Sequence, residues 1–301
     1  MPTFRAAPAT VRVPASSANL GPGFDACGLA LGRWDVVAAQ VTDSGLTVEV
    51  AGEGEAKVKR TERNLVVTAM RAAFDAMGGQ PRGLALTCAN RIPHGKGLGS
   101  SAAAVVAGLC AARELTLGGL ADDEVLRLAT DLEGHPDNVA ACLHGGYTIA
   151  WYDDRGLPQA ISLPVVPGVR AVLLLPASAT TSTAASRAVL PDAVARADAA
   201  LTAGRAALLT AALTRDPALL LAATEDRLHQ PARLAAAPRT AQILTGLRER
   251  GVPAVLSGSG PAVLVLARDD DEAARALAAA PRGWAAEELA IDADGATVLH
   301  A

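Results

Sequence analysis

The feature that most constrains the fold is a helical segment without a polar face. From Ser101 to Arg113 the residues are almost entirely Ala, Val, Leu and Gly. A helix that is apolar around its whole circumference is predicted to be buried on most sides. The chain has 301 residues, half of them hydrophobic, so it is long enough for a large core and more naturally divided into two domains than kept as one.

A glycine-rich loop leads into this helix. It runs from Pro93 to Ser101 and has glycine at positions 95, 97 and 99. Glycines let the backbone approach an anion closely, and the first turn of a helix adds unpaired N–H groups and the positive end of the helix dipole. A phosphate group is therefore the expected ligand, although the order of lysine and serine excludes a Walker A motif. For such a loop taken alone, a plain turn into a core helix is about equally expected.

Two serines at the start of the helix favour a binding site over the plain turn. Ser101, or failing it Ser100, offers a hydroxyl oxygen as a metal ligand. Mg²⁺ prefers a few protein oxygens together with the phosphates of its substrate. The loop is therefore predicted to bind phosphate and magnesium together.

Strands and helices are predicted along the whole chain without a repeat. Strands are expected at residues 34–41, 46–50, 82–89, 145–151, 169–175, 254–257 and 262–267, the first two being adjacent. Helices are expected at residues 65–77, 101–113, 122–132, 192–213, 217–224, 239–250 and 271–279, the first of them capped by Asn64. Prolines and glycines interrupt the pattern around residues 157–168, which predicts domains at 1–164 and 165–301, the second of them α+β.

Two further short stretches gather polar groups. Asn19 and Asp25 flank a rigid Gly-Pro-Gly turn, which fixes two polar side chains on one loop. Taken alone, an Asx-type turn in which these side chains cap their own backbone is the slightly favoured interpretation. Residues 133–138 place two carboxylates, an imidazole and an amide at the end of a predicted helix. A solvated helix end would also explain them, but their density beside a phosphate loop favours a binding site.

The order of these motifs along the chain resembles that of the GHMP kinases. PASSANLGPGFD (residues 14–25) comes first, IPHGKGLGSSAA (92–103) follows, and LSGSGPAVLVL (256–266) stands near the end. GLGSSAA with these two partners is a specific signal, unlike an isolated GxGxxG, and the resemblance covers nearly the whole chain. NLGPGFD and HPDN are similar to the members of the family that act on the amino acid homoserine.

The resemblance implies a nucleotide site. The ATP phosphates are expected at Pro93, His94, Gly95, Lys96, Gly97, Leu98, Gly99, Ser100 and Ser101, with residues 258–261 packing against this loop. Mg²⁺ is expected at Ser101 and Glu133. Glu133 stands closer to Asp137 here than in the best-known members of the family.

The substrate implied by the resemblance is L-homoserine. Its hydroxyl and amino groups are expected near Asn19, Asp25, His135, Asp137 and Asn138, and its carboxylate near Arg187 and Arg233. A guanidinium suits the last task because it binds a carboxylate bidentately, although each arginine alone would more simply form a surface salt bridge. Asp137, with Asn19, is the catalytic candidate, as acceptor of the hydroxyl proton. In the alternative route the proton passes to the phosphate itself, and the sequence leaves both routes open.

The resemblance also implies the fold and the reaction. The fold is expected to be α+β, with an N-terminal domain like a ribosomal-protein fold that contains a left-handed crossover, and a ferredoxin-like C-terminal domain. ATP and the substrate would meet between them, and the product would be O-phospho-L-homoserine, an intermediate of threonine biosynthesis. Two alternatives remain open: a GHMP kinase for mevalonate, a sugar or another small substrate, and a non-catalytic ligand-sensing regulator on the same fold.

Composition excludes several other classes of protein. The net charge is −4, from 27 basic and 31 acidic residues that are intermixed, so no basic tract suits a nucleic acid. The N-terminus lacks a signal-peptide pattern and no apolar run would span a bilayer, so a cytoplasmic protein without a membrane partner is expected. Four scattered cysteines, Cys27, Cys88, Cys110 and Cys142, form no CxxC pair and are predicted to be buried apolar residues. A homodimer is one option for the assembly.

Overall fold

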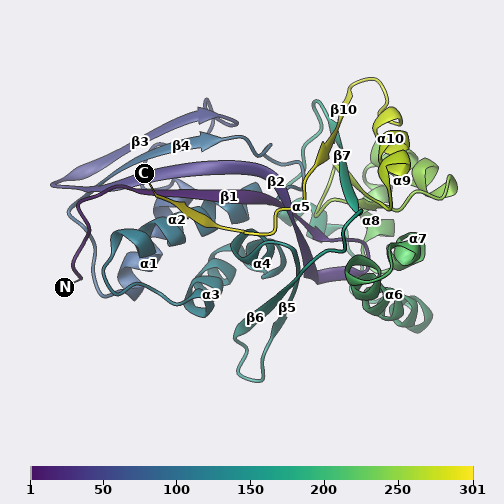
Figure 1. Ribbon diagram of the computed structural model, residues 1–301, viewed down its shortest axis with the longest axis horizontal. Helices are drawn as coiled ribbons and strands as arrows, with labels where there is room; N and C mark the ends of the chain where they lie inside the picture. Colours follow the sequence, from purple (N-terminus) through teal and green to yellow (C-terminus); the bar gives the residue numbers. More distant parts are fainter. Residues whose placement is uncertain (1, 301) are drawn as a thin grey trace.

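The computed structural model describes residues 2–300 as two β-sheets with helices packed against them (Figure 1). The strands of the larger sheet are β1 (Ala9–Asn19), β2 (Gly23–Thr42), β3 (Gly45–Gly52), β4 (Gly83–Asn90), β5 (Tyr147–Tyr152), β6 (Pro158–Leu163) and β11 (Thr297–Leu299). Five of them lie in the order β11-β1-β2-β4-β3, while β5 pairs with β2 and β6 pairs with β5. The long strand β2 therefore has two partners on one side, β5 along its first part and β4 along its second.

Four helices cover one face of the larger sheet. They are α1 (Leu65–Ala76), α2 (Ser100–Leu115), α3 (Asp122–Glu133) and α4 (Asp137–His144). In Figure 1 they lie below the sheet, with α2 in the middle. The helix α2 contacts α1, α3, α4, β1 and β2, which explains why it carries no polar face. The prediction of a buried helix after the glycine-rich loop is confirmed.

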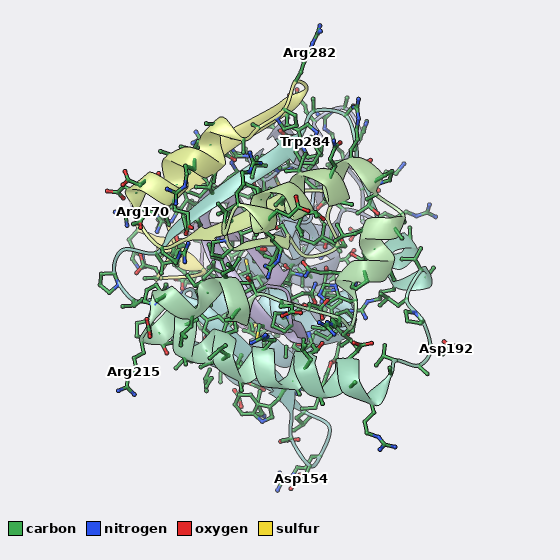
Figure 2. All side chains as sticks on the ribbon, turned by 90° about the vertical axis from the view of Figure 1, so that its right-hand side faces the viewer. Asp154, Arg170, Asp192, Arg215, Arg282 and Trp284 are labelled. Atoms are coloured by element: carbon green, nitrogen blue, oxygen red, sulfur yellow. The ribbon has the colours of Figure 1, made fainter. Side chains whose placement is uncertain are left out.

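The smaller sheet is antiparallel. Its strands are β7 (Arg170–Pro176), β8 (Ala254–Leu256), β9 (Val263–Ala267) and β10 (Trp284–Leu289), in the order β10-β7-β9-β8. The helical elements in this part of the chain are α5 (Thr183–Ala188), α6 (Arg196–Thr214), η1 (Pro217–Leu219), α7 (Leu220–Ala223), α8 (Gln230–Ala235), α9 (Pro238–Glu249) and α10 (Asp270–Ala278). This is the strand order and connectivity of a ferredoxin-like unit, as expected. Figure 2 views this side, with Asp154 of the β5–β6 turn and Arg282 before β10 at opposite ends.

The chain crosses from one sheet to the other between Leu163 and Arg170 and later returns. The strand β11, close to the C-terminus, pairs with β1 of the larger sheet. Division into residues 1–164 and 165–301 remains a proposal, and any such division has to place β11 with the first sheet. Within residues 2–300, no helix has the length and apolar character needed to cross a membrane.

Two expectations about the strands were wrong. The predicted strands at 34–41 and 46–50 exist but are not paired with each other, because β2 is already hydrogen-bonded to β1 and β4, and β3 lies parallel to β4 instead. The helix α1 supplies the crossover that a parallel pair requires. The interruption predicted from residue 157 begins later, because residues 158–163 form β6, the partner of β5. The four cysteines are buried, as predicted.

The contact between α1 and α2 generates a stability prediction on two helical glycines. A Cβ at Gly108 of α2 would lie 2.4 Å from the carbonyl oxygen of Val66, whereas a Cβ at Gly204 of α6 would meet nothing within 4 Å. Gly108→Ala should therefore destabilise the protein by about 1–3 kcal/mol through overpacking. Gly204→Ala should stabilise it by about 0.5–1 kcal/mol, because alanine is the better residue inside a helix. Urea unfolding of both variants measures the two effects, and a Gly108→Ala variant as stable as wild type would contradict the packing at Gly108.

Candidate active site

The glycine-rich loop is fixed at its entry and along its length. The buried carboxylate of Asp35 accepts hydrogen bonds from the backbone N–H groups of Arg91 (2.6 Å) and Ile92 (2.9 Å), where β4 ends. Burial raises the pKa of Asp35, against the lowering effect of these two bonds. The loop then turns through glycines with positive φ, 81° at Gly97 and 65° at Gly99, a conformation that side chains disfavour.

The three sequence motifs meet at this loop. A Cβ at Gly97 would lie 2.1 Å from the carbonyl oxygen of Ser257, in the third motif. The Ser257 hydroxyl lies 2.7 Å from the Gly97 carbonyl oxygen and 2.9 Å from the hydroxyl of Ser17, in the first motif. On the other side of the loop, a Cβ at Gly99 would lie 2.1 Å from the hydroxyl oxygen of Ser16. Neither position leaves room for a Cβ atom, so both must be glycine.

A polar cavity of about 260 Å³ opens in front of the loop. Its lining residues are Gly95, Gly97, Leu98, Gly99, Ser100, Ser101, Glu133, Asn138, Thr181, Ser182, Thr183, Gly258 and Ser259. Six of the nine residues expected at the ATP phosphates are among them. His94 lines a neighbouring cavity instead, and neither cavity includes Pro93 or Lys96.

Ser101 and Glu133 are in direct contact in this cavity. The Ser101 hydroxyl donates to Glu133 Oε1 at 2.5 Å, joining the start of α2 to the end of α3. Burial raises the pKa of Glu133. Two oxygens of this kind fit a hard cation, whose positive charge would favour the charged form of the carboxylate. Across residues 2–300 no group of three or more His, Cys, Asp or Glu side chains could hold a metal, so a cation here would need further oxygens from its ligand.

A second cavity of about 260 Å³ adjoins the first and shares Ser100 and Ser101 with it. Its apolar walls come from Val37, Val58, Leu65, Val66, Cys88, Ala103, Ala104 and Ala107, and its polar groups from Asp35, Asn64, Asn90 and His94. Sequence reasoning missed this cavity, because its walls come from β2, β4, α1 and α2 and from the loops beside them. No local pattern in the chain indicates it.

Asp137 and His135 form a buried pair at the start of α4. His135 Nδ1 lies 2.6 Å from Asp137 Oδ1, which also accepts the backbone N–H of Asn138 at 2.7 Å. Burial alone would lower the pKa of His135, but the hydrogen bond to Asp137 and the charges of Asp137 and Glu133 outweigh it and raise the pKa. The sequence also allowed a solvated helix end at this place, but His135 and Asp137 are buried and bonded to each other.

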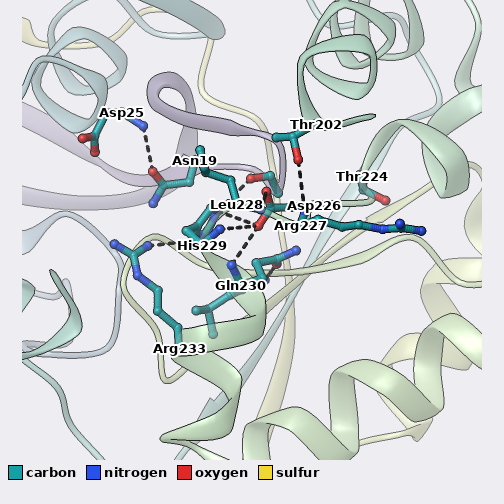
Figure 3. A network of polar contacts seen from close by, with 12 residues as sticks. Asn19, Asp25, Thr202, Thr224, Asp226, Arg227, Leu228, His229, Gln230 and Arg233 are labelled. Carbon is teal, nitrogen blue, oxygen red and sulfur yellow. Dashed lines mark hydrogen bonds and ion pairs between the residues drawn. The ribbon is translucent and has the colours of Figure 1, made fainter. Parts of the chain in front are cut away.

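Asp25 and Arg187 form a bidentate ion pair across the two halves of the chain. Arg187 Nη1 and Nη2 lie 2.9 and 2.6 Å from the two carboxylate oxygens of Asp25. Asn19 fixes the Asp25 backbone, since its Oδ1 accepts the Asp25 N–H at 3.0 Å (Figure 3). Its Nδ2 donates to the Gly258 carbonyl at 3.1 Å. The Asn19 side chain therefore does bond to the backbone of its own loop, but six residues on rather than in an Asx turn, and the Asp25 carboxylate pairs with Arg187 instead.

Arg233 is held at the same place by a buried histidine. Its Nη1 donates to His229 Nδ1 (3.1 Å) and to the Gly258 carbonyl (3.2 Å), and His229 Nε2 donates to the Gly21 carbonyl (2.7 Å). An arginine can only donate and a carbonyl can only accept, so these partners require a neutral His229 protonated on Nε2. Burial lowers the pKa of His229, in agreement with the neutral form.

Three residues of this group, Phe24, Asp226 and His229, were not expected from the sequence. The ring of Phe24 stacks on His229, with centroids 5.1 Å apart, and both Arg187 and Arg233 lie over it at 5.6 and 5.3 Å. Asp226 orders the approach to α8 by accepting three backbone N–H groups (Figure 3). The available signal for α8 was Pro231, a residue typical of the first turn of a helix.

Comparison with known proteins gives consistent matches along the whole chain. Two family models match, the GHMP kinases N terminal domain at residues 64–146 and the GHMP kinases C terminal domain at residues 200–286. A homoserine kinase of Streptomyces avermitilis is 54% identical over 301 residues, 99% of this chain and 98% of that protein. A homoserine kinase of Mycobacterium tuberculosis is 46% identical over 291 residues, 94% and 92% of the two chains.

Solved structures agree with these matches. The crystal structure of a homoserine kinase from Cytophaga hutchinsonii is similar with a TM-score of 0.85 at 26% identity, covering 99% of this chain and 98% of that one. A mevalonate kinase of L. major in complex with R-mevalonate has a TM-score of 0.71 at 16% identity, covering 96% and 98%. The second match is a likeness of fold alone.

The His135–Asp137 pair predicts a pH-dependent contribution to stability. Because the pKa of His135 is raised above its ordinary value of 6.5, the pair stabilises the fold fully below about pH 6.5 and loses this contribution as the pH rises through the raised pKa. The stability difference between wild type and His135→Gln should therefore shrink from pH 6 to pH 9 in urea unfolding. The same substitution in an Asp137→Asn background should show little of this pH dependence. A difference that grows with pH would show that the pair is not an ion pair.

Proposed function

The chain belongs to the GHMP kinase family, and from that membership we propose that it phosphorylates the side-chain hydroxyl of L-homoserine with ATP. The products are O-phospho-L-homoserine and ADP, in a step of threonine biosynthesis. The observation that carries the proposal is the meeting of three motifs at the glycine-rich loop, in a chain 54% identical to a homoserine kinase along nearly its full length. A cytoplasmic location, where ATP is supplied, belongs to the same proposal.

The two adjoining cavities suit the two ends of ATP. The polar cavity offers glycine N–H groups and the start of α2 to the phosphates, and the apolar cavity offers a slot for the base, with Asn64 and Asn90 at its polar positions. Ser101 and Glu133 would hold Mg²⁺, which would neutralise charge on the phosphoryl group during transfer. The loop backbone holds the phosphates, and the shared serines stand where the two cavities join.

The Asp25–Arg187 pair suits a zwitterionic substrate. An amino acid carries an ammonium and a carboxylate a few ångströms apart. Its ammonium can pair with Asp25 and its carboxylate with Arg187, so that both side chains exchange one oppositely charged partner for another. Arg233, fixed by His229 and Gly258, adds a second guanidinium for the carboxylate. Asn19 acts by holding the backbone of Asp25 in place.

Asp137 is the proposed acceptor of the hydroxyl proton. It is 2% exposed, and its Oδ1 is held by His135 and Asn138, which fixes the direction of the carboxylate. The alternative route, in which the proton passes to the phosphate, uses the same carboxylate to orient the hydroxyl. In both routes the carboxylate of Asp137 is itself shielded from bulk water.

The proposed function is tested by measuring ADP release from ATP and Mg²⁺ with purified protein. L-Homoserine should be the best substrate, and mevalonate and galactose should be poor ones, because neither carries an ammonium for Asp25. Chelation of the metal with EDTA should abolish the reaction, and excess Mg²⁺ should restore it. Efficient turnover of mevalonate or galactose, or no turnover of homoserine, would overturn the substrate assignment.

A variant of Arg187 tests the exchange of charges at Asp25. Arg187→Ala should raise the KM for L-homoserine by about ten- to a hundredfold, since a hydrogen bond to a charged group contributes about 1.5–3 kcal/mol. The KM for ATP should change by less than about threefold, because Arg187 lines neither nucleotide cavity. Arg155→Ala, in the exposed turn of the β5–β6 hairpin, is the control and should behave as wild type. An equal loss for both substrates would remove Arg187 from carboxylate recognition.

A further inference from the structure

Lys96 stands in the middle of the phosphate loop, but its ammonium group points to backbone oxygens. Its Nζ donates to the carbonyls of Pro176 (2.7 Å), Ala177 (3.2 Å) and Ala179 (2.7 Å). These carbonyls lie at the last residue of β7 and just after it, in the segment 176–188 that continues through α5 to Arg187. We call this segment the substrate arm.

The chemistry of this contact requires a lysine. An ammonium has three N–H donors around one point, and here three carbonyl oxygens face it. A guanidinium is planar and presents its donors as a fork, so it does not fit the same three oxygens. The chain has 24 arginines and only three lysines, and one of the three is at this position.

The backbone beside Lys96 makes the same connection. The N–H of Thr181 in the arm donates to the carbonyl of Gly95 at 2.9 Å. Among the described residues, no carboxylate lies within ion-pairing distance of the ammonium, so its contacts are with neutral backbone alone. Desolvation lowers the pKa of Lys96, as expected for an ammonium drawn out of water towards these carbonyls.

We propose that Lys96 is a positioning residue that ties the phosphate loop to the substrate arm and so holds Arg187 at the homoserine site. The proposal rests on the function proposed above. It differs from the role expected for a lysine in a phosphate loop, which is to contact a phosphate directly. A fixed conformation of the phosphate loop therefore also fixes the substrate arm, which carries Arg187.

Two substitutions separate positioning from phosphate contact. Lys96→Met keeps an unbranched side chain one atom shorter and removes the donors, and Lys96→Arg keeps the charge but not the geometry. Positioning predicts that both variants raise the KM for L-homoserine by about tenfold or more, the loss expected from one charge-assisted hydrogen bond, with the KM for ATP changed less than about threefold. Phosphate contact predicts a raised KM for ATP in Lys96→Met and near-normal kinetics in Lys96→Arg.

Hydrogen–deuterium exchange of the ligand-free protein gives a readout that does not depend on activity. Amides of residues 177–188 should exchange faster in both Lys96 variants than in wild type, while those of α2 and β4 should not change. Arg155→Met, in the exposed hairpin turn, is the control and should leave the arm as it is in wild type. The exchange in the other elements also shows whether each variant is folded.

The outcomes distinguish this proposal from the function on which it rests. If wild type does not phosphorylate homoserine, the proposed function fails, and the exchange experiment still decides whether Lys96 orders the arm. If wild type is active, unchanged exchange in the arm of the folded Lys96 variants overturns the positioning role. So does a wild-type KM for homoserine in Lys96→Arg, because charge alone would then be sufficient.

Discussion

The close approach of three chain segments between Gly97 and Gly99 is the constraint on which the rest of the site depends. A side chain at Gly97 would lie 2.1 Å from the Ser257 carbonyl oxygen, so the phosphate loop, the first motif and the third motif come together only as backbone and small hydroxyls. The segments come from both halves of the chain. Because the loop packs on the third motif, the nucleotide cavity and the arginines of the second half are fixed relative to each other.

The buried helix α2 explains why such a loop can be rigid. A helix start exposed to water would satisfy its N–H groups with solvent, whereas α2 is packed between the sheet and three helices and directs its first turn at the cavity. The N–H groups of this turn are therefore available to an anion without reorganisation. The apolar composition of residues 101–113 thus serves the site as well as the core.

The sequence was sufficient to predict those features that depend on residues close together in the chain. The glycine-rich loop, α2 and the Asn64 cap were predicted because turn chemistry and periodicity act over a few positions. The parallel pairing of β3 with β4 and the stacking of Phe24 on His229 were not, since these contacts join residues about 40 to 200 positions apart. Lys96 shows the same limit: its place in the loop was predictable, but the direction of its side chain depends on carbonyls some 80 positions away.

The Asp25–Arg187 pair bears on specificity as well as on affinity. A zwitterion that replaces it leaves no charge unpaired, because its ammonium and carboxylate each take over one partner. A hydroxy acid without an ammonium could bind Arg187 only by leaving Asp25 without its partner. Such an acid would therefore lose at Asp25 an attraction of the kind that it gains at Arg187. In the function proposed above, the ion pair would thus disfavour ligands with a single charge, since discrimination requires a cost for the wrong ligand as well as contacts with the right one.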